Sequence, residues 1–116
     1  MSWRLKPNTR ANDGLMYPGP TEAILKKYLI EREVPRIGTL AQEQLRYTAA
    51  ESNRALRLLA PDIRWVESFL TANRMFCIYL SEDESLIRLH SELSGFPITR
   101  IMEIDNVIDP TTASWR

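Results

Sequence analysis

The stretch "IRWVESFLTANRMFCIYLS", from Ile63 to Ser81, decides the fold of this chain. It holds two runs rich in β-branched and aromatic residues, separated by Ala72, Asn73 and Arg74. Residues of this kind favour strands, and a short connection between two such runs is typical of an antiparallel hairpin. The stretch therefore predicts two neighbouring antiparallel strands.

A helix is predicted on the N-terminal side of this hairpin. Thr39 with Gln42 three residues later is a capping-box pattern, which marks the start of a helix. Pro61 and Asp62 mark its end. In between, apolar or small residues recur at helical spacing and form a stripe that we expect to be buried. The stripe consists of Leu45, Ala49, Ser52, Leu56 and Leu59.

A second helix is predicted after the hairpin. Ser81 with Glu84 repeats the capping-box pattern. Gly95 suits the left-handed conformation that commonly ends a helix, and Pro97 prevents the helix from continuing. The stripe expected on its inner side consists of Leu86, Leu89 and Leu93.

One further strand is predicted at each end of this region. Apolar and charged residues alternate in "KKYLIEREVP" (26–35), and "ITRIMEIDNVI" (98–108) supplies the last strand. The complete order is strand, helix, strand, strand, helix, strand. This βαββαβ order predicts an α+β protein with the ferredoxin-like fold, in which a four-stranded antiparallel sheet carries both helices on one face.

Alternation along the strands divides their side chains between the two faces of the sheet. The purely apolar sets, one for each strand in chain order, are expected beneath the helices: Ile30/Val34, Val66/Leu70, Phe76/Ile78/Leu80 and Met102/Ile104. The mixed sets, in the same order, are expected on the open face: Leu29/Glu31/Glu33, Trp65/Glu67/Phe69, Met75/Cys77/Tyr79 and Ile101/Glu103. An open face bearing Trp65, Phe69 and Tyr79 would expose a large apolar patch, which usually marks an interface. We therefore expect a homodimer packed sheet against sheet, as in dimeric α+β barrels.

The composition limits the organisation and the partners of the protein. A chain of 116 residues with 44% hydrophobic residues fits one domain with one core. We expect a flexible N-terminal leader over residues 1–26, because Pro, Gly, Asn and Asp concentrate there, then the ferredoxin-like domain over residues 27–109 and a C-terminal tail over residues 110–116. Fifteen basic and fifteen acidic residues balance, which argues against binding of nucleic acid.

The compartment follows from cysteine usage and hydropathy. Cys77 is the only cysteine, so it cannot form an internal disulfide, which favours a reducing compartment. The N-terminus lacks the apolar core of a signal peptide, and no apolar run approaches the roughly 20 residues that span a membrane. A cytoplasmic protein that does not bind membranes is predicted.

Three segments, "YLIEREVP", "IRWVESFLTANRMFCIYLS" and "IRLHSELSGFPITRI", resemble in this order a small bacterial family of unknown function with a ferredoxin-like fold. One member of that family is described as a nickel-binding, nickel-responsive protein. The resemblance spans Lys27 to Val107 and rests on Glu31, Pro35, Trp65, Ser68, Cys77, Tyr79, His90, Gly95 and Pro97. It implies nickel, or another divalent transition metal, as the cofactor to consider, and it brings no catalytic activity.

The candidate metal ligands are Glu31, Glu67 and His90. With Glu103, the two glutamates are expected on the open face, where clustered carboxylates would recruit a cation or raise one pKa. Carboxylate, imidazole and water together can hold a divalent transition metal. Alternatively, arginines could pair with these carboxylates. The candidates for this pairing are Arg32, Arg64 and Arg100.

His90 is the only histidine of the chain, and it also has a structural interpretation. A histidine near the end of a helix can be held there by the helix dipole or by a hydrogen bond to the core. The sequence has no HxxxH, HxxE or CxxC spacing that would support a site. Because His90 lies beside the leucine stripe, a site that joins it to the glutamates would need a sheet edge or a residue of a partner subunit.

A ligand pocket is predicted from Trp65, Ser68, Cys77, Tyr79 and Glu103. Trp65 and Tyr79 could stack on a ligand or anchor the dimer. Cys77 has no basic neighbour or second cysteine to activate it, which favours packing as a small apolar residue over a role as thiolate.

Three classes of function follow from these candidates. The first, which we favour, is a non-enzymatic protein that binds a nickel-like divalent metal or a small ligand. The second is a cofactor-independent oxygenase or isomerase with His90 as base and Tyr79 or Ser68 as polar partner. The third is a protein-interaction module without a ligand. An RNA-recognition domain shares the order of elements, but it needs aromatics in glycine-rich strand motifs and a basic surface, which this sequence lacks.

Overall fold

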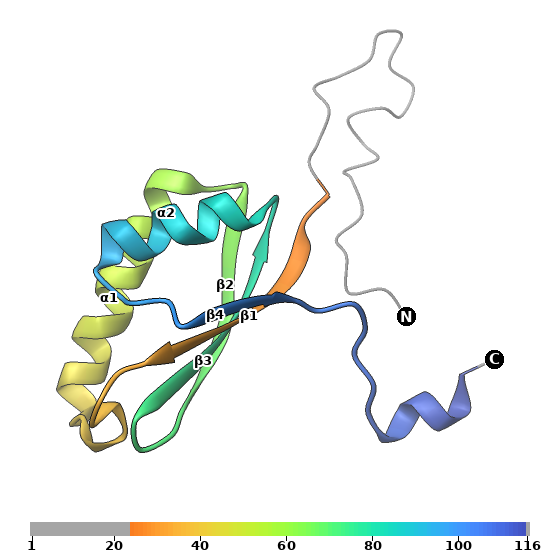
Figure 1. Cartoon of the computed structure of the whole chain (residues 1–116), viewed down its shortest axis with the longest axis horizontal. Helices are drawn as coiled ribbons and strands as arrows, with labels where there is room; N and C mark the ends of the chain where they lie inside the picture. Colours follow the sequence, from red (N-terminus) through yellow and green to blue (C-terminus); the bar gives the residue numbers. More distant parts are fainter. Residues whose placement is uncertain (1–23, 116) are drawn as a thin grey trace, which may run out of the picture.

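The computed structural model describes residues 24–115, and its main elements follow the predicted βαββαβ order (Figure 1). They are β1 (Lys26–Glu33), α1 (Gln42–Leu59), β2 (Ile63–Leu70), β3 (Arg74–Ser81), α2 (Glu84–Ser94) and β4 (Arg100–Glu103). Two short 3-10 helices are added, η2 (Ile37–Thr39) before α1 and η3 (Pro110–Ser114) near the C-terminus. The α+β fold class is thereby confirmed.

The four strands form one antiparallel sheet in the order β2-β3-β1-β4. Both helices lie on the same side of this sheet, and the segment after β4 leads away from it (Figure 1). The buried core lies between sheet and helices and includes Ile30, Ile63, Cys77, Tyr79 and Ile87. This is the ferredoxin-like arrangement, with one face of the sheet covered and the other open.

The predicted domain limits can be compared with the elements. Strand β1 begins at Lys26, one residue before the expected start of the domain. The predicted leader lies almost wholly in residues 1–23, which are outside the described residues. The predicted tail contains η3, whose first turn is capped by the side chain of Asp109.

The helix starts differ from the predicted caps. The N-terminal cap of α1 is Ala41, whose backbone N–H donates to the side chain of Gln44 at 2.8 Å, and Thr39 belongs to η2 instead. The cap of α2 is Asp83, whose carboxylate accepts from the Leu86 N–H. Gly95 ends α2 in the left-handed conformation with φ of 82°, as predicted.

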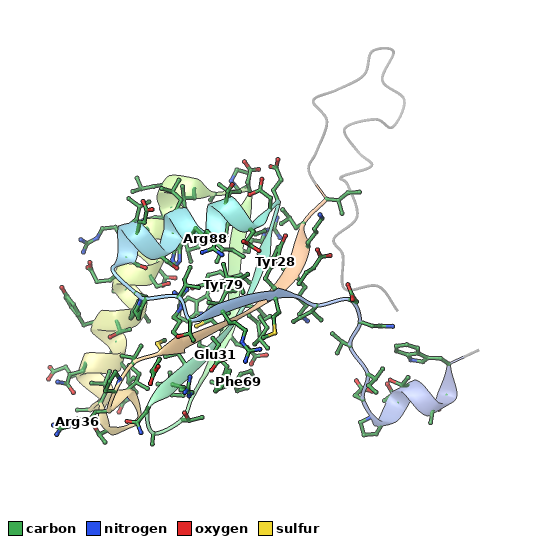
Figure 2. The ribbon with its side chains drawn as sticks, viewed as in Figure 1. Tyr28, Glu31, Arg36, Phe69, Tyr79 and Arg88 are labelled. Atoms are coloured by element: carbon green, nitrogen blue, oxygen red, sulfur yellow. The ribbon has the colours of Figure 1, made fainter. Side chains whose placement is uncertain are left out.

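The covered face of β3 is the opposite of the predicted one. Met75, Cys77, Tyr79 and Ser81 are buried toward the helices, whereas the alternate set was expected there. The open face carries Phe76, Ile78 and Leu80. Because both sets are rich in apolar residues, the alternation gives the period of the strand but not its phase, and a shift of one residue exchanges the faces. Figure 2 shows Tyr79 between sheet and helices, and Glu31 and Phe69 on the side away from the helices.

Strand β4 is inverted in the same way. Ile101 pairs with Ile30, and Glu103 pairs with Tyr28, so both lie on the covered side, where Met102 was expected. Met102 pairs with Leu29 on the open face. The predictions for β1 are correct, since Ile30 and Val34 contact the core while Leu29, Glu31 and Glu33 alternate with the buried residues.

Strand β2 contains a bulge that sequence alternation could not reveal. Trp65 pairs with Tyr79 and Glu67 pairs with Ile78, so Val66 is an extra residue between them. Val66 is therefore 48% exposed rather than covered, and Trp65 lies beneath the helices rather than on the open face. Glu67 and Phe69 lie on the open face, as predicted.

The inner side of α2 is more polar than predicted. Ile87, His90 and Ser91 are buried, whereas Leu89 and Leu93 are exposed by 40% and 49%. Of the predicted leucine stripe, only Leu86 packs against the core. The stripe of α1 is confirmed, because Leu45, Ala49, Ser52, Leu56 and Leu59 are all buried or half-buried.

Candidate functional site

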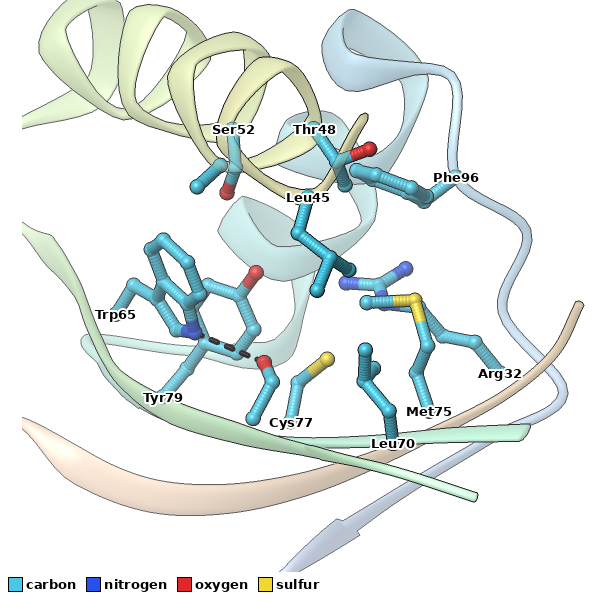
Figure 3. A pocket seen from close by; sticks show the side chains of 12 residues that line it. Arg32, Leu45, Thr48, Ser52, Trp65, Leu70, Met75, Cys77, Tyr79 and Phe96 are labelled. Carbon is cyan, nitrogen blue, oxygen red and sulfur yellow. Dashed lines mark hydrogen bonds between the residues drawn. The ribbon is translucent and has the colours of Figure 1, made fainter. Parts of the chain in front are cut away.

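A pocket of about 230 Å³ lies between α1 and the covered face of the sheet (Figure 3). Its wall is formed by α1, by strands β1, β2 and β3, and by the segment that follows α2. Leu45, Leu70 and Met75 make much of this wall apolar. Hydroxyl groups from Thr48, Ser52, Ser68 and Tyr79 add polar atoms.

The structure brings four of the five predicted pocket residues together. Trp65, Ser68, Cys77 and Tyr79 all line the pocket, on the covered side of the sheet rather than between two open faces. The bulge in β2 places Trp65 and Ser68 on the same side, where the Trp65 indole Nε1–H donates to Ser68 Oγ at 2.9 Å. The fifth residue, Glu103, does not line the pocket. It is exposed and belongs to β4, at the edge of the sheet.

Among the described residues, Arg32 is the one charged residue of the pocket wall. The sequence indicated it only as a candidate partner of the open-face carboxylates, a role that Arg74 and Arg100 take for Glu31. Arg32 is fully buried and lines the pocket. Its Nη1 donates to Ser91 Oγ at 2.8 Å and to the Pro97 carbonyl oxygen at 3.0 Å, while Nη2 has no hydrogen-bond partner within residues 24–115. Its guanidinium carbon lies 5.7 Å from the centre of the Phe96 ring. The signal was available, since Arg32 alternates in phase with Tyr28 and Ile30 and so belongs to the covered face.

His90 is fully buried between α2 and α1. Its Nε2 lies 3.3 Å from both the hydroxyl and the carbonyl oxygen of Ser52, and its ring centre lies 5.3 Å from that of Tyr79. A carbonyl oxygen only accepts, so its contact with Nε2 assigns the proton of the neutral ring to this nitrogen. Nδ1 has no hydrogen-bond partner in the part of the chain that the structure describes.

Burial determines the protonation of the His90 imidazole and of the Tyr79 hydroxyl. It lowers the pKa of His90 below its usual 6.5, with the charge of Arg32 acting in the same direction, so the imidazole is neutral at pH 7. It raises the pKa of the Tyr79 hydroxyl above 10.0, although Arg32 opposes this effect. Tyr79 is therefore a hydrogen-bond donor at neutral pH.

The three predicted metal ligands do not come together in one subunit. Glu31 pairs with Arg74 at 2.6 Å and with Arg100 at 3.6 Å on the open face, and its side chain is only 14% exposed. Glu67 is exposed on the same face, whereas His90 is buried on the other side of the sheet.

Nickel, the metal that the family resemblance implies, does not fit the donors of a single subunit. Within residues 24–115, no three His, Cys, Asp or Glu side chains lie close enough to hold a metal ion. The expected convergence of Glu103 with Glu31 and Glu67 is wrong, because Glu103 pairs with Tyr28 on the covered side. The lone pair of His90 Nδ1 is enclosed in the core, with no carboxylate hydrogen-bonded to it among the described residues.

These features define a small α+β protein with a ferredoxin-like sheet and a buried arginine in a pocket of ligand size. Residues 28–104 match the family described as "Nickel responsive protein SCO4226-like", and the chain belongs to this family. The predicted family resemblance is thereby confirmed.

The solved structures include a protein with the same fold. It is described as "Crystal structure analysis of SCO4226 from Streptomyces coelicolor A3(2)", with a TM-score of 0.57 and 12% sequence identity over 71% of this chain and 99% of that chain. At this identity the similarity shows a common fold alone. No curated protein matches the sequence. Over the described residues, no helix has the length and apolar character needed to cross a membrane.

Proposed function

We propose that this protein is a non-enzymatic binding protein that holds a small organic ligand in the pocket between α1 and the sheet. The observation that carries the proposal is the pocket itself, which combines an apolar wall with a few polar groups. Ligand sites typically have this composition. The volume of about 230 Å³ is below the roughly 300–1,000 Å³ of sites for drug-sized molecules, which favours a smaller ligand.

The polar groups near the pocket support binding over catalysis. Ser52 lies 3.3 Å from His90 Nε2, which resembles a nucleophile beside a base. Because Nε2 carries the proton, however, His90 cannot take a proton from Ser52 at this nitrogen. A catalytic histidine is also oriented through its second nitrogen, and Nδ1 has no such partner within residues 24–115. Tyr79 stays protonated at neutral pH, so it is not a general base either.

We further propose that the protein is a homodimer that packs through its open sheet face. The apolar residues of this face form a patch, called the open-face patch below. It consists of Leu29, Phe69, Phe76, Ile78, Leu80 and Met102. An apolar patch on an uncovered sheet supports self-association, because its burial removes apolar surface from water. Most of these residues differ from those predicted, yet the expectation of an interface on this face is retained.

A second candidate function is the binding of a divalent metal between two subunits. Glu31 and Glu67 share the open face, where a face-to-face dimer would bring two copies of each together. Glu67 is the main candidate ligand, because Glu31 would first have to give up its ion pairs with Arg74 and Arg100. Nickel is the first metal to test, because the family is described as nickel-responsive. His90 takes no part in this candidate site. We also propose a cytoplasmic location, because a single cysteine favours a reducing compartment.

A small-molecule screen by NMR tests the pocket. The indole N–H of Trp65 donates to Ser68 on the pocket wall, so its resonance should shift when a ligand enters. Small aromatic amides, alcohols and acids serve as probes. Ala49→Leu fills the pocket from α1, and Ala50→Leu makes the same change on the exposed side of that helix. We expect Ala49→Leu to abolish binding and Ala50→Leu to preserve it. The proposal is wrong if no probe moves the Trp65 resonance, or if binding survives Ala49→Leu.

A further inference from the structure

We propose that the pocket selects small organic carboxylates, with the negative charge of the ligand held by the guanidinium of Arg32. This inference rests on the proposed function, because it names the class of ligand for the same pocket. It depends on three observations, which are the burial of Arg32, its missing counter-charge and its unused nitrogen.

Arg32 is a cation without exposed surface. A buried charge is costly unless it is paired with an opposite charge or satisfied by hydrogen bonds. The ion pairs among the described residues involve other arginines, and the groups that accept from Arg32 are neutral. The pocket wall contributes no acidic side chain from residues 24–115. An anion bound in the pocket would supply the missing negative charge.

The guanidinium lies beside the pocket, with one terminal nitrogen held and the other without a partner among the described residues. Nη1 is occupied by Ser91 and Pro97, which fixes the plane of the group. Nη2 keeps its hydrogens without a partner in the described part of the chain. In Figure 3 the guanidinium extends toward Leu45, Met75 and Phe96 at the pocket. Because Nη2 itself has almost no accessible surface, a carboxylate oxygen reaches it only after the side chains around it move aside. It can then accept from Nη2 in a charge-assisted hydrogen bond, which is stronger than a neutral one.

The rest of the wall favours an apolar body behind the carboxylate. Leu45, Leu70 and Met75 offer aliphatic contacts, and Trp65 and Tyr79 offer aromatic ones. An inorganic anion would leave these surfaces uncovered. With one cation on the wall, the pocket also matches a single negative charge better than a doubly charged phosphate. A monocarboxylate of the size of benzoate combines the charge with the apolar body.

Arg32 also has a purely structural interpretation, which the experiment must separate from ligand binding. Its contacts with Ser91 and Pro97 tie β1 to the end of α2, where the helix dipole favours a cation. In that case Arg32 would stabilise the fold and show no preference for anionic ligands. The two interpretations differ in the effect of ligand charge on affinity.

The experiment compares benzoate with benzamide, which has nearly the same shape without the charge. Both are titrated at neutral pH into the full chain, with calorimetry and the Trp65 indole resonance as readouts. We expect benzoate to bind at least about tenfold more tightly than benzamide, which corresponds to one charge-assisted hydrogen bond. Arg32→Met should remove this preference, whereas Arg32→Lys should keep part of it. The wild-type comparison alone tests the proposal if Arg32→Met does not fold.

Each outcome is informative. Equal affinities for benzoate and benzamide would show that the pocket binds small molecules without selecting an anion, so the inference would be wrong and the proposed function would stand. A benzoate preference that persists in Arg32→Met would overturn the assignment to Arg32. If neither these two compounds nor the neutral alcohols of the screen move the Trp65 resonance, the proposed function itself fails.

Discussion

Ser52 of α1 and His90 of α2 meet in the interior, where Ser52 Oγ and His90 Nε2 are 3.3 Å apart. The same nitrogen reaches the Ser52 carbonyl oxygen at 3.3 Å. The only histidine of the chain therefore links the two helices across the core. The sequence allowed His90 to be either a ligand or base in a site or a structural residue bonded to the core. This geometry matches the structural interpretation.

The first prediction concerns the pH dependence of stability. The pKa of His90 is lowered in the folded protein, so the unfolded chain takes up this proton first as the pH falls. The free energy of unfolding should be highest above pH 6.5, the usual pKa of histidine, and should decrease as the pH falls from there toward the lower folded pKa. Urea unfolding at a series of pH values measures this decrease.

His90→Gln provides the matched variant for this experiment. Glutamine can donate a hydrogen bond to Ser52 but does not titrate, so its unfolding free energy should lack the decrease just below pH 6.5. The carboxyl groups of Asp83 and Asp109, whose pKa values are lowered from 3.8 by hydrogen bonds, titrate too far below pH 6.5 to cause a decrease that begins there. The same pH dependence in both proteins would refute the assignment to His90.

The sequence predicts the order of elements correctly because each signal is local. Hairpin composition, helical periodicity and the glycine at the end of α2 are all read within a few neighbouring residues. The phase of β3 could not be predicted, since Phe76, Ile78 and Leu80 are as apolar as the buried set. The bulge at Val66 depends on pairing with β3, which is a contact between strands rather than a property of β2 alone.

The candidate site was only partly predictable for a related reason. The rule that apolar residues lie inside predicts the burial of Ile30 and Ile87 correctly. It fails where polar side chains are buried because they form hydrogen bonds with one another. His90 and Ser91 are buried on α2 because Ser52 and Arg32 provide their partners. These partners are 38 and 59 residues away in sequence, so no local pattern reveals them.

The second prediction concerns the bond between Arg32 and Ser91. Ser91→Ala removes one of the two acceptors of a fully buried guanidinium. Leaving a buried donor unsatisfied costs about 1–3 kcal/mol, so we expect a decrease of that size in the free energy of unfolding. Chemical denaturation measures it.

Ser94→Ala is the control on the same helix. The Ser94 hydroxyl donates only to the His90 carbonyl of its own helix, at 2.9 Å, and such bonds contribute little to helix stability. We expect a change within about 0.5 kcal/mol. Equal effects of both substitutions would mean that the contact between Arg32 and Ser91 adds little stability.

The third prediction tests the dimer. Ile78 lies at the centre of the open-face patch, opposite Leu29 and Glu67 in the neighbouring strands. Ile78→Glu would place a charge in the proposed interface and should halve the particle mass measured by light scattering. Leu58→Glu, on an α1 residue that is 70% exposed, should leave the mass unchanged. A wild-type protein that is already monomeric would contradict the proposal.

The fourth prediction concerns nickel and uses the same variants. If the metal binds between two open faces, Glu67→Gln should weaken nickel binding measured by calorimetry, and the monomeric Ile78→Glu variant should weaken it as well. A metal selective for the folded dimer also raises the melting temperature, which gives a second readout. His90→Gln should retain the affinity of the wild type, because His90 is buried on the other side of the sheet. Loss of nickel binding in His90→Gln, with Glu67→Gln unaffected, would overturn the location of the site and transfer it to the helix-covered side.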